Sequence, residues 1–173
     1  MLAELAGLVM KQAIAVVGLI LAATVARGQF VSNARSAQAA VKGEAVTYLF
    51  PEQVTLPAGK VSVVSMHFRV AAGLHVNSHT PSDEFLIPTV FSIPEGAGVK
   101  LVGAKYPAGV DITLPADPKT KLNVYSGEFA IEARMVAQAG NHLVEARLKY
   151  QACDQTQCLP PKTITVPIDV IGR

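Results

Sequence analysis

The sequence predicts an all-β protein, built as an immunoglobulin-like sandwich of two sheets. Many short segments alternate apolar and polar residues with a period of two, which is typical of strands with one buried face. Residues that favour turns separate these segments, and no stretch has a convincing helical period. Half of the residues are hydrophobic and only 16% are charged, so the chain can bury a substantial core.

The N-terminal part has the pattern of a secretory signal. Lys11 precedes an apolar run over residues 13–26, and Ala26-Arg27-Gly28 has the small-x-small form of a cleavage site. The alternative is an uncleaved membrane anchor, but the run is shorter than the roughly 20 apolar residues of a spanning helix. We therefore expect an exported protein, periplasmic or otherwise, with no stable membrane span after cleavage. The expected organisation is a signal peptide over 1–28, a flexible leader over 29–43 and one folded domain over 44–173.

The expected strands follow one another along the domain. Residues 61–70 are the clearest, because Val64, Met66 and Phe68 fall on one face of the strand. In the first half of the domain, strands are expected at 44–50, from 73 to 76, and at 85–93, where Pro88 indicates an edge strand or a bulge. In the second half, they are expected at 99–104, 125–135, 143–152 and 163–170.

Residues 105–121 interrupt this series. They contain Pro107, Gly109, Pro115 and Pro118, which indicate a long connection with little regular structure. Long loops in compact domains are often functional. The segment is therefore a candidate lid.

Charge and motif content exclude several classes of function. The chain has 15 basic and 13 acidic residues, a net charge of +2 and no Lys/Arg cluster, so no nucleic-acid partner is expected. There is no phosphate-binding glycine loop and no recognisable Ser-His-Asp arrangement. A zinc site would need two ligands besides the cysteines, and the histidines lack finger spacing. We expect no metal and no cofactor. The histidines considered as zinc ligands are His67, His75, His79 and His142.

The candidate site is the cysteine pair Cys153 and Cys158, in a C-x4-C spacing. Gln155-Thr156 between them is compatible with a turn, so the sulfurs can pair, although the sequence alone leaves the pairing open. A disulfide closing so short a loop stabilises a fold by only about 2 kcal/mol. Two nearby sulfurs suit thiol–disulfide exchange, because a second thiol must resolve the mixed disulfide. Two interpretations stay open: a redox-active pair, or a structural disulfide in a non-catalytic exported binding module.

Polar residues near the pair have two interpretations each. Asp154 either raises the pKa of the adjacent thiol or simply favours a turn. His75 and His79 are interpreted as ordinary polar loop residues. Asp83 and Glu84 are interpreted as solvated loop acids rather than as a general base.

These residues also carry a resemblance to a known family. Tyr150-Gln151-Ala152-Cys153, followed by Cys158-Leu159-Pro160-Pro161-Lys162-Thr163, resembles the N-terminal periplasmic domain of the thiol–disulfide interchange proteins of the DsbD family. Residues 73–79 and 81–89 look like a form of the same domain. The resemblance covers roughly residues 44–171. The best-known members have one more residue between the cysteines, so the ring here is tighter.

The resemblance implies an immunoglobulin-like domain whose cysteine pair shuttles electrons. Its implied partners are thioredoxin-fold proteins, among them disulfide isomerases and factors for cytochrome c biogenesis, and a membrane thiol reductase. Because this sequence ends after the sandwich, we expect that reductase to be encoded separately. Cys158 is implied to form the mixed disulfide and Cys153 to resolve it. A cap loop shields the pair in the family, and its counterpart is expected within 105–121. Whether the domain is itself an oxidoreductase or one component of a protein-disulfide reductase stays open.

Overall fold

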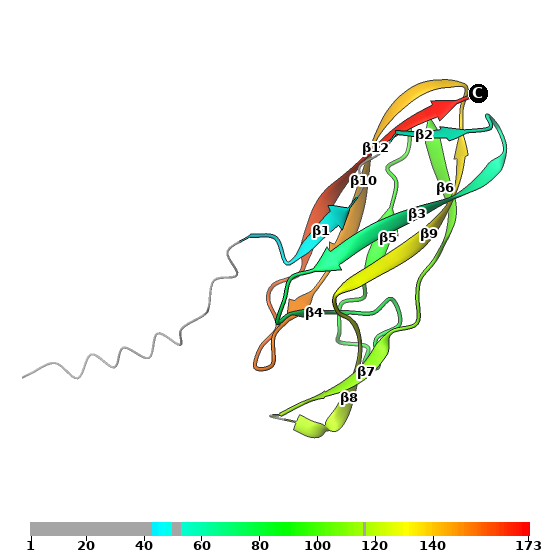
Figure 1. Cartoon of the computed structure of the whole chain (residues 1–173). Coiled ribbons are helices and arrows are strands. Elements are labelled where there is room, and N and C mark those ends of the chain that lie inside the picture. The colour runs from blue at the N-terminus through cyan, green and yellow to red at the C-terminus, as the bar shows by residue number, and fades with distance from the viewer. Residues whose placement is uncertain (1–42, 50–52, 116) are drawn as a thin grey trace, which may run out of the picture. The chain divides into compact units, whose positions relative to one another are not determined.

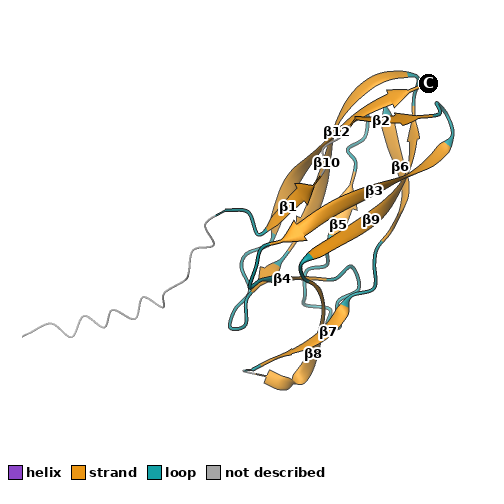
Figure 2. Ribbon diagram, in the orientation of Figure 1, coloured by secondary structure: helices purple, strands orange, loops and turns teal. Residues whose placement is uncertain are grey.

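The computed structural model describes residues 43–49, 53–115 and 117–173, and all regular secondary structure within them is β-strand (Figure 2). The predicted signal peptide, and the predicted leader apart from Gly43, lie outside the described residues. No helix in the described ranges has the length and apolar character needed to cross a membrane. The strands are β1 (Val46–Leu49), β2 (Gln53–Leu56), β3 (Val61–Val70), β4 (His75–Asn77), β5 (Val90–Ser92), β6 (Val99–Lys105), β7 (Val110–Leu114), β8 (Asp117–Tyr125), β9 (Glu128–Ala137), β10 (Gly140–Tyr150), β11 (Ala152–Cys153) and β12 (Lys162–Gly172).

Two four-stranded sheets form the layers of the sandwich (Figure 1). One sheet has the strand order β1-β3-β9-β6 and is antiparallel throughout. The other has the order β2-β12-β10-β5, in which β2 runs parallel to β12 at one edge. The long pair β10–β12 is in continuous register from Gly140↔Gly172 to Tyr150↔Lys162. This pair ends at Tyr150, directly before the cysteine segment, so a regular ladder fixes where that segment begins.

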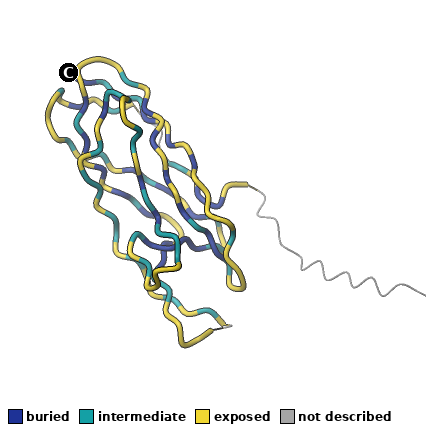
Figure 3. Tube along the Cα trace, turned by 180° about the vertical axis from the view of Figure 1, so that it is seen from behind, coloured by how far each residue is buried: buried dark blue, intermediate teal, exposed yellow. Residues whose placement is uncertain are grey.

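The core lies between these two sheets, as the alternation of the sequence predicted. Along the strands, buried and exposed residues alternate (Figure 3). The buried members of both sheets belong to one contiguous apolar cluster. Each fully buried large apolar side chain contributes about 1.5–3 kcal/mol. The prediction of an all-β immunoglobulin-like sandwich is confirmed. The cluster includes Met66, Phe68, Ile131 and Met135 from one sheet and Val144, Leu148, Tyr150, Val166 and Ile168 from the other.

A third, smaller sheet has the order β11-β4-β8-β7 and was not predicted. Its β7–β8 hairpin occupies most of residues 105–121, so the prediction of a long irregular connection is wrong. The prolines do not interrupt the strands. Pro107 precedes β7, Pro115 lies in the turn, and Pro118 is the second residue of β8. Proline is tolerated in turns and at strand ends.

Smaller differences concern strand ends. Phe85–Ile87 is not a strand, and β5 is short, although it lies at a sheet edge as Pro88 indicated. The strand predicted at 125–135 begins at Glu128, because Ser126-Gly127 forms a tight turn after β8. Gly127 has φ of +63°, a conformation that glycine adopts without steric cost. Strand β2 was not predicted.

Candidate functional site

The two cysteines form a disulfide at the start and end of a tight loop. Cys153 ends the short strand β11, and Cys158 forms an isolated antiparallel bridge with it, so that the two Cα atoms are 3.9 Å apart. The backbone N–H of Leu159 donates to the carbonyl of Ala152, which continues the pairing beyond the disulfide. The pairing that the sequence left open is therefore present.

The two sulfurs belong to residues with opposite access to solvent. Cys153 is 1% exposed, whereas Cys158 is exposed. An incoming thiolate attacks the sulfur that it can reach, and the other sulfur leaves. The arrangement therefore favours attack at Cys158 and departure of Cys153.

Asp154 organises the turn between the cysteines. Its Oδ1 accepts hydrogen bonds from the backbone N–H groups of Thr156 and Gln157, at 2.7 and 2.8 Å, and from the Thr156 hydroxyl at 2.8 Å. These donors hold the pKa of the Asp154 carboxyl below its ordinary value of 3.8. The interpretation of Asp154 as a residue that favours the turn is confirmed.

Gln151 ties the cysteine segment to the neighbouring loop. Its Nε2 donates to the carbonyl of Leu159 at 3.3 Å, and its Oε1 accepts from Asn77 Nδ2 at 3.2 Å. Asn77 Nδ2 also donates to the carbonyl of Ile87 at 3.1 Å. The side chains of Gln151 and Asn77 thus join the residue after Cys158 to β4 and to the loop before β5.

His75 is not the ordinary loop residue that its sequence context indicated. It lies in β4, directly opposite Cys153 in the antiparallel β4–β11 pair, and is 7% exposed. Burial lowers the pKa of its imidazole below 6.5, and the nearby Asp154 carboxylate offsets part of this effect. The strand was too short for its alternation to reveal a buried histidine beside a cysteine.

His79 lies in a loop, as the sequence indicated, and it makes specific contacts there. Its ring stacks on Tyr106 with centroids 3.6 Å apart, and its Nδ1 lies 3.0 Å from the carbonyl of Thr89. The Tyr106 hydroxyl accepts from the backbone N–H of Phe91. His79 therefore connects two loops instead of reaching the disulfide. Asp83 and Glu84 are exposed, in agreement with their interpretation as solvated acids.

The β7–β8 hairpin contributes to a hollow of about 330 Å³ beside the cysteine loop. Residues of the hairpin, of β4 and of the cysteine loop line it together. The candidate lid is thus a hairpin placed next to the site. The lining is Gly73, Leu74, His75, Ile112, Thr113, Leu114, Pro115, Val124, Ser126 and Gln155.

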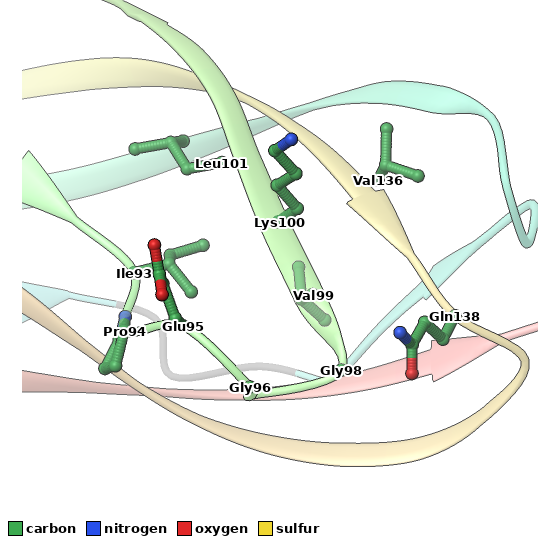
Figure 4. A pocket seen from close by; sticks show the side chains of 10 residues that line it. All are labelled: Ile93, Pro94, Glu95, Gly96, Gly98, Val99, Lys100, Leu101, Val136 and Gln138. Atoms are coloured by element: carbon green, nitrogen blue, oxygen red, sulfur yellow. The ribbon is translucent and has the colours of Figure 1, made fainter.

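A larger hollow, of about 630 Å³, lies where β9 ends and β6 begins (Figure 4). The cysteine loop is at the other end of the sandwich, next to β4 (Figure 1). Figure 4 shows side chains such as Ile93, Val99 and Val136 around the hollow, and neither cysteine is among the lining residues. Among the described residues, no group of three His, Cys, Asp or Glu side chains is arranged to hold a metal ion.

Comparison with known families agrees with this geometry. The family described as "Thiol:disulfide interchange protein DsbD, N-terminal" matches residues 45–169, which include both cysteines. The chain belongs to this family. It is a thiol–disulfide interchange domain whose cysteine pair is joined in a disulfide. DsbD N-terminal domains are periplasmic and interact with thioredoxin-like proteins.

The chain is also similar to a solved DsbD N-terminal domain. The crystal structure is that of the reduced Neisseria meningitidis domain, with 18% sequence identity and a TM-score of 0.44. The match covers 62% of this chain and 77% of that chain. No curated protein matches the chain.

Proposed function

We propose that this DsbD-family domain relays electrons through the Cys153–Cys158 pair, to or from thioredoxin-fold partners. The observation that favours this function most is the difference in exposure between the two cysteines. A partner thiolate attacks Cys158, the disulfide breaks, and Cys153 leaves as a thiolate. In the reverse direction, Cys153 attacks the mixed disulfide at Cys158 and releases the partner.

The loop geometry supports a reactive disulfide over a structural one. Hydrogen bonds to Asp154, and the pairing of Leu159 with Ala152, already define the turn without the sulfurs. A covalent link across so short a loop adds only about 2 kcal/mol. The alternative, a non-catalytic exported module with a structural disulfide, has no comparable observation in its favour.

Location and electron source are part of the same proposal. The domain works in the periplasm after export by the segment 1–28 and cleavage of that segment. Its electrons come from a membrane thiol reductase and pass through thioredoxin-fold proteins. The periplasmic location and the thioredoxin-fold partners are supported by membership of the family, and the export signal by the apolar run over residues 13–26.

Single-cysteine variants test the roles of the two sulfurs. Cys153→Ser keeps the exposed Cys158 thiol, so it forms a stable mixed disulfide with an oxidised thioredoxin-fold protein that gel electrophoresis detects without reductant. Cys158→Ser keeps only the buried sulfur and forms none. The double variant is the control for adventitious bands. Equal trapping by both single variants, or trapping by neither, contradicts the proposal.

A further inference from the structure

His75 and Cys153 share one buried environment. They are directly opposite in the antiparallel β4–β11 pair, so their side chains point to the same face of the sheet. Cβ atoms in such pairs are about 4.5–5.5 Å apart. His75 is 7% exposed and Cys153 1% exposed. The imidazole is therefore next to the sulfur that leaves or attacks during exchange.

The imidazole has an unused polar atom. Nε2 of His75 is buried and has no hydrogen-bond partner. Buried polar atoms in proteins are almost always paired, so an unpaired one calls for an explanation. In the disulfide, Cys153 has no hydrogen to donate. After reduction it is a thiol, which can donate to a neutral imidazole nitrogen.

The surroundings keep this imidazole neutral and able to accept a proton. Burial lowers its pKa below 6.5. The charged group acting on it is Asp154, whose carboxylate favours the imidazolium once it forms. The hollow next to His75 is lined by Ser126 and Val124 from the β8 side, by Ile112 to Pro115 from the hairpin and by Gln155 from the cysteine loop. None of these lining residues is titratable.

We propose that His75 is the proton acceptor for the Cys153 thiol when the reduced domain resolves a mixed disulfide at Cys158. The proton moves from Cys153 Sγ to His75 Nε2. The Cys153 thiolate then attacks Cys158 Sγ, the Cys153–Cys158 bond forms, and the bond from Cys158 to the partner breaks. The partner sulfur leaves with the electron pair and takes up a proton, so the domain is oxidised and the partner disulfide is reduced.

The inference rests on the proposed function, and oxidised glutathione serves as the probe disulfide. The reduced domain is mixed with it, reactions are stopped with acid, and mass spectrometry follows the glutathione adduct as it forms and resolves. We expect His75→Gln to form the adduct at the unaltered rate but to resolve it about tenfold more slowly at pH 7. The difference should shrink above the ordinary thiol pKa of about 8.5, where Cys153 ionises without an acceptor.

His142→Gln is the matched control, because His142 is half-buried on β10 and its Nε2 lies 3.0 Å from the carbonyl of Gln138, away from the cysteine loop. It should resolve the adduct like the unaltered domain. If His75→Gln resolves the adduct at pH 7 as fast as the unaltered domain, His75 is not the proton acceptor. A slower resolution by the same factor at every pH also overturns the role, because it indicates that the substitution has displaced the Cys153 sulfur. If the unaltered reduced domain forms no adduct, the proposed function fails and the role of His75 with it.

A second measurement needs no variant at position 75. Nitrogen NMR of the unaltered domain reports on the His75 ring in the oxidised and the reduced states. Reduction should shift the Nε2 resonance, because the atom gains the Cys153 thiol as a partner. An Nε2 resonance that is the same in both states overturns the inference even if His75→Gln does not fold.

Discussion

At the scale of single residues, the two ends of one tight loop differ in environment. Cys158 is exposed, while Cys153 is buried in a strand pair with His75 opposite. Asp154 fixes the loop between them through three hydrogen bonds to its Oδ1. The buried side of the disulfide thus has a titratable neighbour, and the exposed side has an open approach.

The buried imidazole makes stability depend on pH. The pKa of His75 is lower in the folded than in the unfolded chain, so the unfolded chain takes up the proton first as the pH falls. The contribution of His75 is therefore complete above pH 6.5 and is lost as the pH falls through the folded pKa. Urea unfolding from about pH 8 to about pH 5 should show a decline that is smaller in His75→Gln.

An unchanged slope in His75→Gln contradicts the assignment of the decline to His75. Asp154 and Asp117 titrate below this pH range. The pKa values of Asp154 and Asp117 are lowered from 3.8 by hydrogen bonds, so their contributions are present above pH 3.8 and are lost at lower pH.

Residues of the site differ in how far the sequence could reveal them. The cysteine pair and the turn role of Asp154 are predictable, because spacing and turn propensity are local properties. The burial of His75 and the contacts of Gln151 depend on which strands meet. β4 brings residue 75 to residue 153 across a large separation in sequence, and no local pattern reports such a pairing.

At the scale of elements, Gln151 joins three segments that bear on the site. Gln151→Ala removes the donor to the Leu159 carbonyl and the acceptor for Asn77, which is itself buried. Leaving buried polar groups without a partner lowers the free energy of unfolding by about 1–3 kcal/mol. Urea unfolding of the oxidised domain measures this loss. Gln138→Ala is the control, because that side chain is exposed, and it should change stability by less than about 0.5 kcal/mol. Equal effects of the two substitutions argue against the bridge.

The elements that the sequence predicted well are the long ones. β3, β9, β10 and β12 have enough residues for their alternation to be unambiguous. The β7–β8 hairpin was missed because its prolines and Gly109 outweighed a weak alternation. Most of its residues are exposed or half-buried, and only Val124 and Tyr125 at the end of β8 are buried, so hydrophobicity gives little signal there.

At the scale of the whole molecule, we expect substitutions in the sandwich core to change stability without touching the cysteine loop. Leu148→Ala on β10 opens a cavity in the core and should lower the free energy of unfolding by about 2–5 kcal/mol. Leu143 on the same strand is 76% exposed, so Leu143→Ala should change it by less than about 0.5 kcal/mol. Urea unfolding compares the two variants. Similar losses in both would contradict the assignment of the buried face of β10.

The measurement that tests the central claim most directly is the reduction potential of the domain, obtained by equilibration in thiol–disulfide buffers. Structural disulfides lie below about −300 mV, and working redox pairs lie well above that value. We predict a value of about −200 mV, with the domain still folded after reduction, because the Asp154 turn and the core do not depend on the sulfurs. A pair that is reduced only below about −300 mV, or only when the domain unfolds, contradicts a role of Cys153 and Cys158 in electron relay.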